Sequence, residues 1–125
     1  KLICNDTWLN DVMTEGKMDT KPKFIENTSN WQNKIIMVQG LSSDVKHEVT
    51  TITKSIDLLF IDGDHTYEGV KSDFENYIDL VKPGGYLVFH DYGWAEGVKK
   101  IVHEEFLPKT TYFNSSENMI WGRIK

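Results

Sequence analysis

Two acids and a histidine stand close together at the end of an apolar run. The run covers residues 58–61, and Asp62, Asp64 and His65 follow it, with a glycine between the two acids. Carboxylates can bind a hard divalent cation or accept hydrogen bonds, and a histidine can take up a proton near neutral pH. This spacing predicts a site for acid–base or metal-assisted chemistry.

Other apolar runs of the chain also end in groups that can do chemistry. The polar groups after the four predicted strands are Asp6, Gly40 with Ser42, Asp62 and Asp91. In a parallel sheet the carboxyl ends of the strands meet at one edge, which is where ligands bind. We therefore expect these groups to surround one crevice.

The elements that must position these groups alternate between strand and helix. Strands are predicted over 2–4, 34–39, 55–61 and 86–90, with residues 58–61 buried on both faces. Helices are predicted from Phe24 to Asn33 or Lys34, from a cap at Ser42 or Ser43, over 66–81, and over 94–107, while residues 11–23 are read as a loop or short helix.

The Lys-Pro-Gly-Gly segment at 82–85 is predicted to break the third helix ahead of the fourth strand, and residues 110–125 predict an antiparallel hairpin. This order predicts a doubly wound, Rossmann-like α/β sheet, mostly parallel, with an antiparallel hairpin at its end.

Composition limits the class of protein. A chain of 125 residues with 39% hydrophobic residues predicts one domain over 1–125. Its 14 basic and 19 acidic residues give a net charge of -5, which argues against nucleic acid and anionic membranes as partners. With one cysteine, Cys4, and no apolar segment near the roughly 20 residues that span a bilayer, we expect a soluble, cytoplasmic protein that binds a small molecule.

The segment from Ile56 to Tyr92 resembles the class I S-adenosylmethionine-dependent methyltransferases. Its acid-Gly-acid-His-x-Tyr, Pro-Gly-Gly and His-Asp-Tyr motifs are similar to those of the small-molecule O-methyltransferase branch, which includes macrolide-sugar and catechol-type enzymes. The segments "KLICNDTW", "KIIMVQGLSSD" and "ENMIWGRIK" resemble further strands of that fold, so the resemblance covers nearly the whole chain. The family's first strand and glycine-rich loop are not seen before Lys1, and we expect an amino-terminally truncated methyltransferase domain.

The resemblance implies a role for each candidate residue. S-adenosylmethionine would contact the cofactor-binding residues, which are Asp6, Trp8, Gly40, Ser42 and Asp62. The catalytic candidates are His65, His90 and Asp64, and Asp62 with Asp91 could hold a metal ion such as Mg²⁺. The implied reaction is methyl transfer to a hydroxyl of a small molecule such as a sugar or secondary metabolite, and a homo-oligomer is left open.

Each role has a plainer structural alternative. Asp6 could be a loop acid or a cap, and Trp8 is more often a core residue. Ser42 could cap a helix, His65 could cap the next one, and the two metal candidates could be acids exposed at a sheet edge. The alternative for the whole chain is a catalytically inactive nucleotide-binding or assembly module with the same fold.

Overall fold

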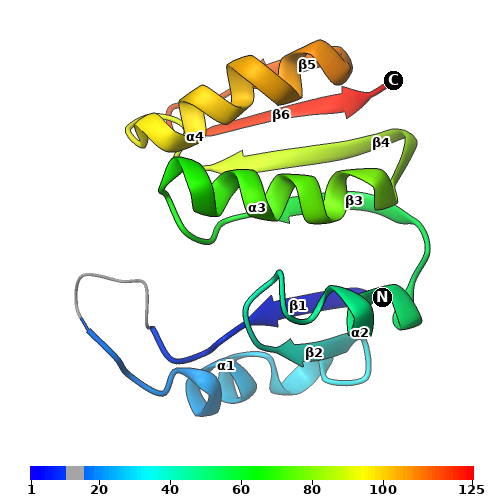
Figure 1. The fold of residues 1–125 in the computed structure, drawn as a ribbon. Coiled ribbons are helices and arrows are strands. Elements are labelled where there is room, and N and C mark those ends of the chain that lie inside the picture. Colours follow the sequence, from blue (N-terminus) through cyan, green and yellow to red (C-terminus); the bar gives the residue numbers. More distant parts are fainter. Residues whose placement is uncertain (11–15) are drawn as a thin grey trace. The chain divides into compact units, whose positions relative to one another are not determined.

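The computed structural model describes residues 1–10 and 16–125 (Figure 1). The strands are β1 (Leu2–Asp6), β2 (Ile35–Gln39), β3 (Ile56–Ile61), β4 (Val81–His90), β5 (Thr110–Ser115) and β6 (Met119–Ile124). The α-helices are α1 (Lys21–Asn27), α2 (Lys46–Ile52), α3 (Tyr67–Tyr77) and α4 (Glu96–Ile101). The chain forms two compact units, Lys1–Ile52 and Thr53–Lys125, here called unit 1 and unit 2.

Unit 1 is built on a parallel pair of strands. β1 pairs with β2 from Leu2 opposite Ile35 to Asp6 opposite Gln39, so both strands end at the same level. The side chain of Asn5 donates hydrogen bonds to the carbonyl oxygens of Val38, at 3.0 Å, and Gly40, at 2.9 Å. These bonds fix the carboxyl end of β2 against β1.

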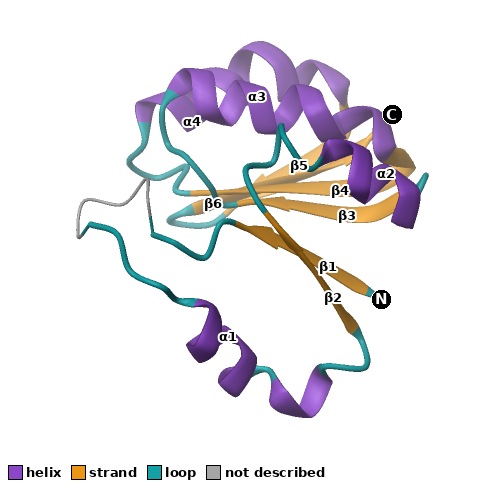
Figure 2. Ribbon diagram, turned by 60° about the horizontal axis from the view of Figure 1, so that its bottom comes forward, coloured by secondary structure: helices purple, strands orange, loops and turns teal. Residues whose placement is uncertain are grey.

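Unit 2 is a mixed four-stranded sheet in the order β3-β4-β6-β5. β3 and β4 are parallel, whereas β6 is antiparallel to both β4 and β5. Figure 2 shows α3 and α4 over the same face of this sheet, and the core between them includes Leu87, Phe89 and Ile120. The predicted α/β class, with parallel strands followed by an antiparallel hairpin, is confirmed.

Helix α3 forms where the sequence places apolar residues three and four apart. Val70, Phe74 and Tyr77 are buried on one face, and the hydroxyl oxygen of Thr66 caps the helix by accepting a hydrogen bond from the backbone N–H of Gly69 at 3.1 Å. The helix ends at Tyr77, before the predicted end at Val81, because a 3₁₀ turn over Ile78–Leu80 leads directly into β4.

The Lys-Pro-Gly-Gly segment lies inside β4, so the prediction that it precedes the strand was wrong. Val81 already pairs with Ile56, but the next paired residue of β3, Leu58, lies opposite Tyr86. The four residues between therefore form a bulge, in which Gly84 has a φ of 81°.

The prediction that β3 is buried on both faces was also wrong. Leu58 is 57% exposed and Phe60 is 49% exposed, whereas Ile61, on the opposite face, is buried. β3 lies at an edge of its sheet, and α3 and α4 cover only one sheet face. A continuous apolar run cannot by itself distinguish a central strand from an edge strand of this kind.

The two helices of unit 1 begin at other residues than predicted. α1 begins at Lys21, where Pro22 stands in the first turn and its missing N–H costs no hydrogen bond. It ends at Asn27, so the predicted end at Asn33 or Lys34 was wrong; a separate 3₁₀ turn over Ser29–Trp31 follows. α2 begins at Lys46, and Ser42 and Ser43 lie in the turn that precedes it. In the segment predicted as a loop or short helix, residues 11–15 lie outside the described part of the chain and 16–20 form a loop.

The final helical segment is longer than α4 alone. α4 continues as a π-helix over Val102–Phe106 and a 3₁₀ turn over Leu107–Lys109, close to the predicted end at Pro108. Within the described residues, none of the helices combines the length and apolar character needed to cross a membrane. The assignment of residues 1–125 to a single domain stays a prediction.

Candidate active site

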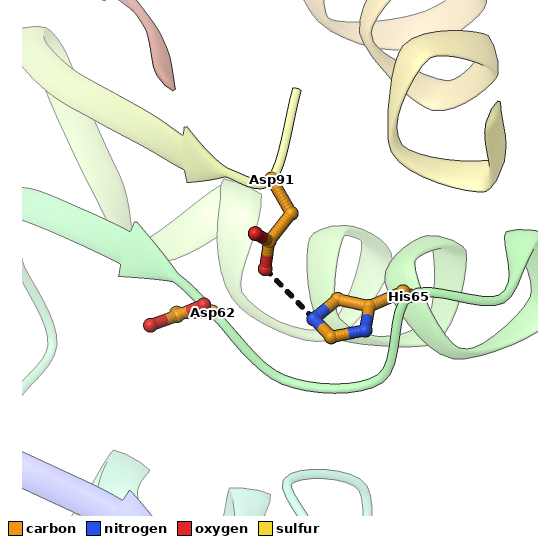
Figure 3. Close-up of side chains that lie close together, drawn as sticks. All are labelled: Asp62, His65 and Asp91. Carbon is orange, nitrogen blue, oxygen red and sulfur yellow. Dashed lines mark ion pairs between the residues drawn. The ribbon is translucent and has the colours of Figure 1, made fainter. Parts of the chain in front are cut away.

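The predicted acids of unit 2 meet beyond the ends of two neighbouring strands. Asp62 follows β3 and Asp91 follows β4, and these parallel strands are paired up to Ile61 opposite Phe89. One ligand atom from each of Asp62, His65 and Asp91 lies within 4.8 Å of the other two. Figure 3 shows the three side chains gathered at this edge of the sheet.

His65 points at Asp91. Its Nε2 atom lies 2.8 Å from Oδ2 of Asp91, and its side chain is 30% exposed (Figure 3). The alternative role of His65 as a helix cap was wrong, because Thr66 caps α3. His65 instead belongs to the turn that carries the chain from β3 into α3.

Asp91 is the most constrained residue of the site. Its φ of 58° lies in the left-handed region, and its Oδ1 atom accepts hydrogen bonds from Trp94 Nε1 at 2.8 Å and Asn118 Nδ2 at 3.1 Å. Burial opposes ionisation of this carboxyl, but the hydrogen bonds from Trp94 and Asn118, together with the nearby His90 ring, outweigh burial and lower the pKa of Asp91 to about 2. Asp91 is therefore a fixed negative charge at neutral pH.

His90 lies between the two carboxylates. Its Nδ1 atom is 3.1 Å from Asp62 Oδ1 and 3.2 Å from Asp91 Oδ2, yet it is buried and neither contact has hydrogen-bond geometry. The contact with Asp91, followed by the charge of Asp62, raises the pKa of His90. Burial is the main cause that raises the pKa of Asp62. The two acids thus differ in how readily they ionise.

Asp64 holds the start of α3. Its Oδ1 atom accepts a hydrogen bond from the backbone N–H of Thr66 at 2.8 Å, which shapes the turn before the helix. A Cβ atom on Gly69 would collide with the Asp64 side chain, so glycine is needed where the two approach. The catalytic role expected for Asp64 stays a prediction.

The expected cofactor-binding residues of unit 1 lie at the ends of β1 and β2. The backbone N–H of Gly40 donates to the carbonyl oxygen of Asp6 at 3.0 Å, so these two strand ends are adjacent. Gly40 has a φ of 147°, and a Cβ atom there would lie 2.6 Å from Val45 Cγ1. Ser42 is half-buried in the turn that follows. A residue other than glycine at position 40 would therefore disturb this edge.

Asp6 borders a hollow of about 590 Å³. Its carboxylate is exposed, and Oδ1 accepts a hydrogen bond from the backbone N–H of Trp8 at 2.7 Å. Trp8 is 3% exposed and packs against Phe24 with ring centroids 5.3 Å apart, so it is a core residue that contributes one wall of the hollow. The hollow is large enough to accept part of a nucleoside at Asp6.

The two groups of predicted residues are each brought together within their own unit. Asp6 is adjacent to Gly40 in unit 1, and Asp62 is close to Asp91 in unit 2. The expectation that all four surround one crevice stays a prediction.

The donor atoms of unit 2 are compatible with a divalent cation. Asp62 and Asp91 supply carboxylate oxygens and His65 an imidazole nitrogen, all within 4.8 Å of one another. The buried Nδ1 atom of His90 also lies within 3.2 Å of both carboxylates and makes no hydrogen bond there, so this polar atom is left unsatisfied beside the two acids. These residues fit a cation such as Mg²⁺.

Sequence reasoning missed Trp94 and Asn118, which both donate to Asp91. Trp94 stands three residues after Asp91 and was assigned to the following helix, whereas Asn118 belongs to the turn of the carboxyl-terminal hairpin. Only the pairing of β6 with β4 brings Asn118 to the site. Local sequence spacing contains no sign of that contact.

Comparisons with known proteins agree with this fold. A family model described as "Methyltransferase domain" matches residues 1–92. The chain therefore belongs to this methyltransferase family, and the predicted class I methyltransferase fold is confirmed.

Individual similar proteins match different shares of the chain. An uncharacterized protein of Acanthamoeba polyphaga mimivirus is 46% identical over 57 residues, which are 43% of this chain and 26% of that protein. The solved structure of the O-methyltransferase NovP has a TM-score of 0.71 at 17% identity and covers 98% of this chain. MycE methyltransferase, solved with Mg, SAH and mycinamycin VI, has a TM-score of 0.58 at 14% identity over 78% of this chain. The chain spans 59% of the NovP structure and 34% of the MycE structure.

Proposed function

We propose that this chain transfers a methyl group from S-adenosylmethionine to a hydroxyl oxygen of a small molecule, such as a sugar or another secondary metabolite. The observation that carries the proposal is the 2.8 Å contact between His65 Nε2 and Asp91 Oδ2 beyond the ends of β3 and β4. A histidine oriented by a carboxylate is suited to remove a proton from a hydroxyl group as the oxygen becomes methylated.

The carboxylate determines which nitrogen of His65 acts as the base. Asp91 is ionised at neutral pH and can only accept a hydrogen bond, so the neutral imidazole donates through Nε2–H. The lone pair is then on Nδ1, which takes the proton of the hydroxyl. Asp91 holds the ring in this tautomer and stabilises the imidazolium that forms, as a positioning residue.

Unit 1 supplies the proposed cofactor contacts. The exposed carboxylate of Asp6 can accept hydrogen bonds from ribose hydroxyls, and the strand end at Gly40 with Ser42 would contact the adenine side. Bound S-adenosylmethionine would supply an electrophilic methyl group, so the protein mainly has to align the oxygen with it.

A cation is a second proposed component of the site. Asp62 and Asp91 would hold it through their carboxylates, and when bound it would lower the pKa of an acceptor hydroxyl. The MycE structure contains Mg together with SAH, which supports this assignment at the level of the fold. NovP is itself described as an O-methyltransferase, which supports oxygen as the acceptor atom.

The base is tested by measuring methyl transfer to a panel of sugar and phenolic hydroxyls. We expect His65→Gln to lower kcat by about 100-fold or more. His47→Gln, which changes an exposed histidine of α2, should leave kcat unchanged. Equal rates for wild type and His65→Gln would overturn the assignment of the base, and the absence of methyl transfer to every acceptor would overturn the proposed activity.

The cofactor and the cation are tested separately. Asp6→Ala should weaken binding of S-adenosylhomocysteine in calorimetry by about 10-fold or more, because hydrogen bonds to a charged acceptor are lost. Glu26→Ala, an exposed acid of α1, is the matched control. A chelator should lower turnover without changing this binding, and unchanged turnover would remove the cation from the proposal.

A further inference from the structure

A second hollow, of about 270 Å³, lies beside Asp91 in unit 2. Its lining residues are Gly93, Trp94, Glu117 and Asn118. Trp94 is 59% exposed as a residue, although its indole Nε1–H donates to Asp91. The ring is therefore held by its polar edge, while the residue as a whole stays largely open to solvent.

Two segments that line this hollow are each hydrogen-bonded to Asp91. Asn118 reaches Asp91 from the hairpin turn, and Trp94 reaches the same carboxylate oxygen from the loop after β4. A Cβ atom on Gly93 would collide with the carbonyl oxygen of Glu117 and lie 3.1 Å from Asn118 Oδ1. Loop and turn thus pack directly against each other, which makes the hollow a built feature of the fold.

The lining suits a particular kind of ring. An exposed indole offers an apolar surface for stacking, while the Glu117 carboxylate and the Asn118 amide can bind hydroxyl groups. Glu117 is exposed and negatively charged, so it disfavours an anionic occupant. A neutral ring with hydroxyl groups on its rim matches both properties.

We propose that this hollow is the acceptor subsite, where Trp94 stacks against a neutral polyhydroxylated ring, such as a sugar, while Glu117 and Asn118 bind its hydroxyl groups. This inference rests on the proposed methyl transfer, and it assigns the acceptor's class and position. The His65 ring packs against Trp94 at 67°, with centroids 5.0 Å apart. Trp94 is therefore a neighbour both of the hollow and of the base.

The test follows the indole N–H signal of Trp94 in a ¹H–¹⁵N spectrum of the full chain, which has four tryptophans. The signal is assigned by its loss in Trp94→Phe. Methyl α-rhamnopyranoside, catechol and glucose 6-phosphate are added at concentrations of about 10 mM, where weak complexes are detectable. The neutral sugar should shift the Trp94 signal most. An unmoved signal, or a larger shift with catechol or the phosphate, would overturn the proposal.

Variants separate stacking from folding. Trp94→Ala should weaken binding of the rhamnoside about 10-fold, read from the side-chain amide signals of Asn118, whereas Trp94→Phe keeps a stacking ring and should bind within about threefold of wild type. Trp31→Ala, which removes an indole that is 56% exposed in unit 1, should bind like wild type. Equal weakening in Trp31→Ala and Trp94→Ala would overturn the assignment.

Calorimetry with S-adenosylhomocysteine separates this inference from the proposed function. Trp94→Ala should bind S-adenosylhomocysteine as wild type does. If wild type binds S-adenosylhomocysteine but the rhamnoside leaves Trp94 unmoved, the acceptor subsite is wrong and the proposed function stands. If the rhamnoside shifts Trp94 while S-adenosylhomocysteine does not bind, the subsite is supported as a sugar site and the proposed methyl transfer fails.

Discussion

Replacing Asp91 with asparagine tests whether the ionised carboxylate stabilises the fold. Asparagine tolerates the left-handed backbone at this position and keeps an oxygen for Trp94 and Asn118, so the change removes mainly the charge. The pKa of Asp91 is about 2, compared with an ordinary value of 3.8. Since one pKa unit corresponds to about 1.4 kcal/mol, the charge contributes about 2 kcal/mol to the free energy of unfolding at neutral pH.

The pH dependence gives this prediction its sign. A carboxyl group whose pKa is lowered by folding stabilises the protein fully above its unfolded pKa, and this contribution is lost as the pH falls through the folded pKa. Urea unfolding should therefore show Asp91→Asn to be about 2 kcal/mol less stable at pH 7, with the difference shrinking between about pH 4 and pH 2. Asp79→Asn, an exposed acid, should stay within about 0.5 kcal/mol of wild type.

A difference between wild type and Asp91→Asn that is the same at pH 7 and at pH 2 would refute this reasoning. It would show that packing or backbone conformation, and not ionisation, accounts for the loss of stability.

Three further predictions concern residues of the site and of the helices packed beside it. Contact with Asp91 raises the pKa of His90 above 6.5, so its contribution is present below pH 6.5 and is lost as the pH rises; His90→Gln should lower the melting temperature more at pH 5.5 than at pH 9. Burial raises the pKa of Asp62, so its ionised form is unfavourable in the folded state, and thermal unfolding at pH 7 should show Asp62→Asn to be more stable than wild type. A Cβ atom on Gly97 would collide with backbone atoms at the start of α3, so Gly97→Ala should cost about 1–3 kcal/mol in urea unfolding, while Glu96→Ala should stay within about 0.5 kcal/mol.

The sequence was sufficient to predict elements whose apolar residues recur at helical spacing, and apolar runs that end abruptly in charged residues. The spacing of Val70, Phe74 and Tyr77 predicted α3, and the acids after two apolar runs predicted that Asp62 and Asp91 would meet. These features depend on local pattern and on the common geometry of parallel strands.

Features that depend on tertiary contacts could not be predicted in this way. The bulge over 82–85 exists because β3 pairs with Val81 as well as with Tyr86, and no local pattern specifies that pairing. The role of Asn118 likewise depends on the position of β6 beside β4. Sequence spacing therefore identified the two acids but not the donors that fix the charge of Asp91.

The exposed face of β3 gives Asp62 a second role, separate from the proposed cation site: its charge can limit aggregation. Residues 58–61 form an uncharged, apolar stretch with high β-propensity at a sheet edge, which is the kind of segment that promotes aggregation. Asp57, which pairs with Lys82, precedes this stretch, and Asp62 follows it. Charges that flank such a strand act as gatekeepers against self-association. A substitution that neutralises Asp62 would thus stabilise the folded monomer. The same substitution would lower the resistance of the protein to aggregation through β3.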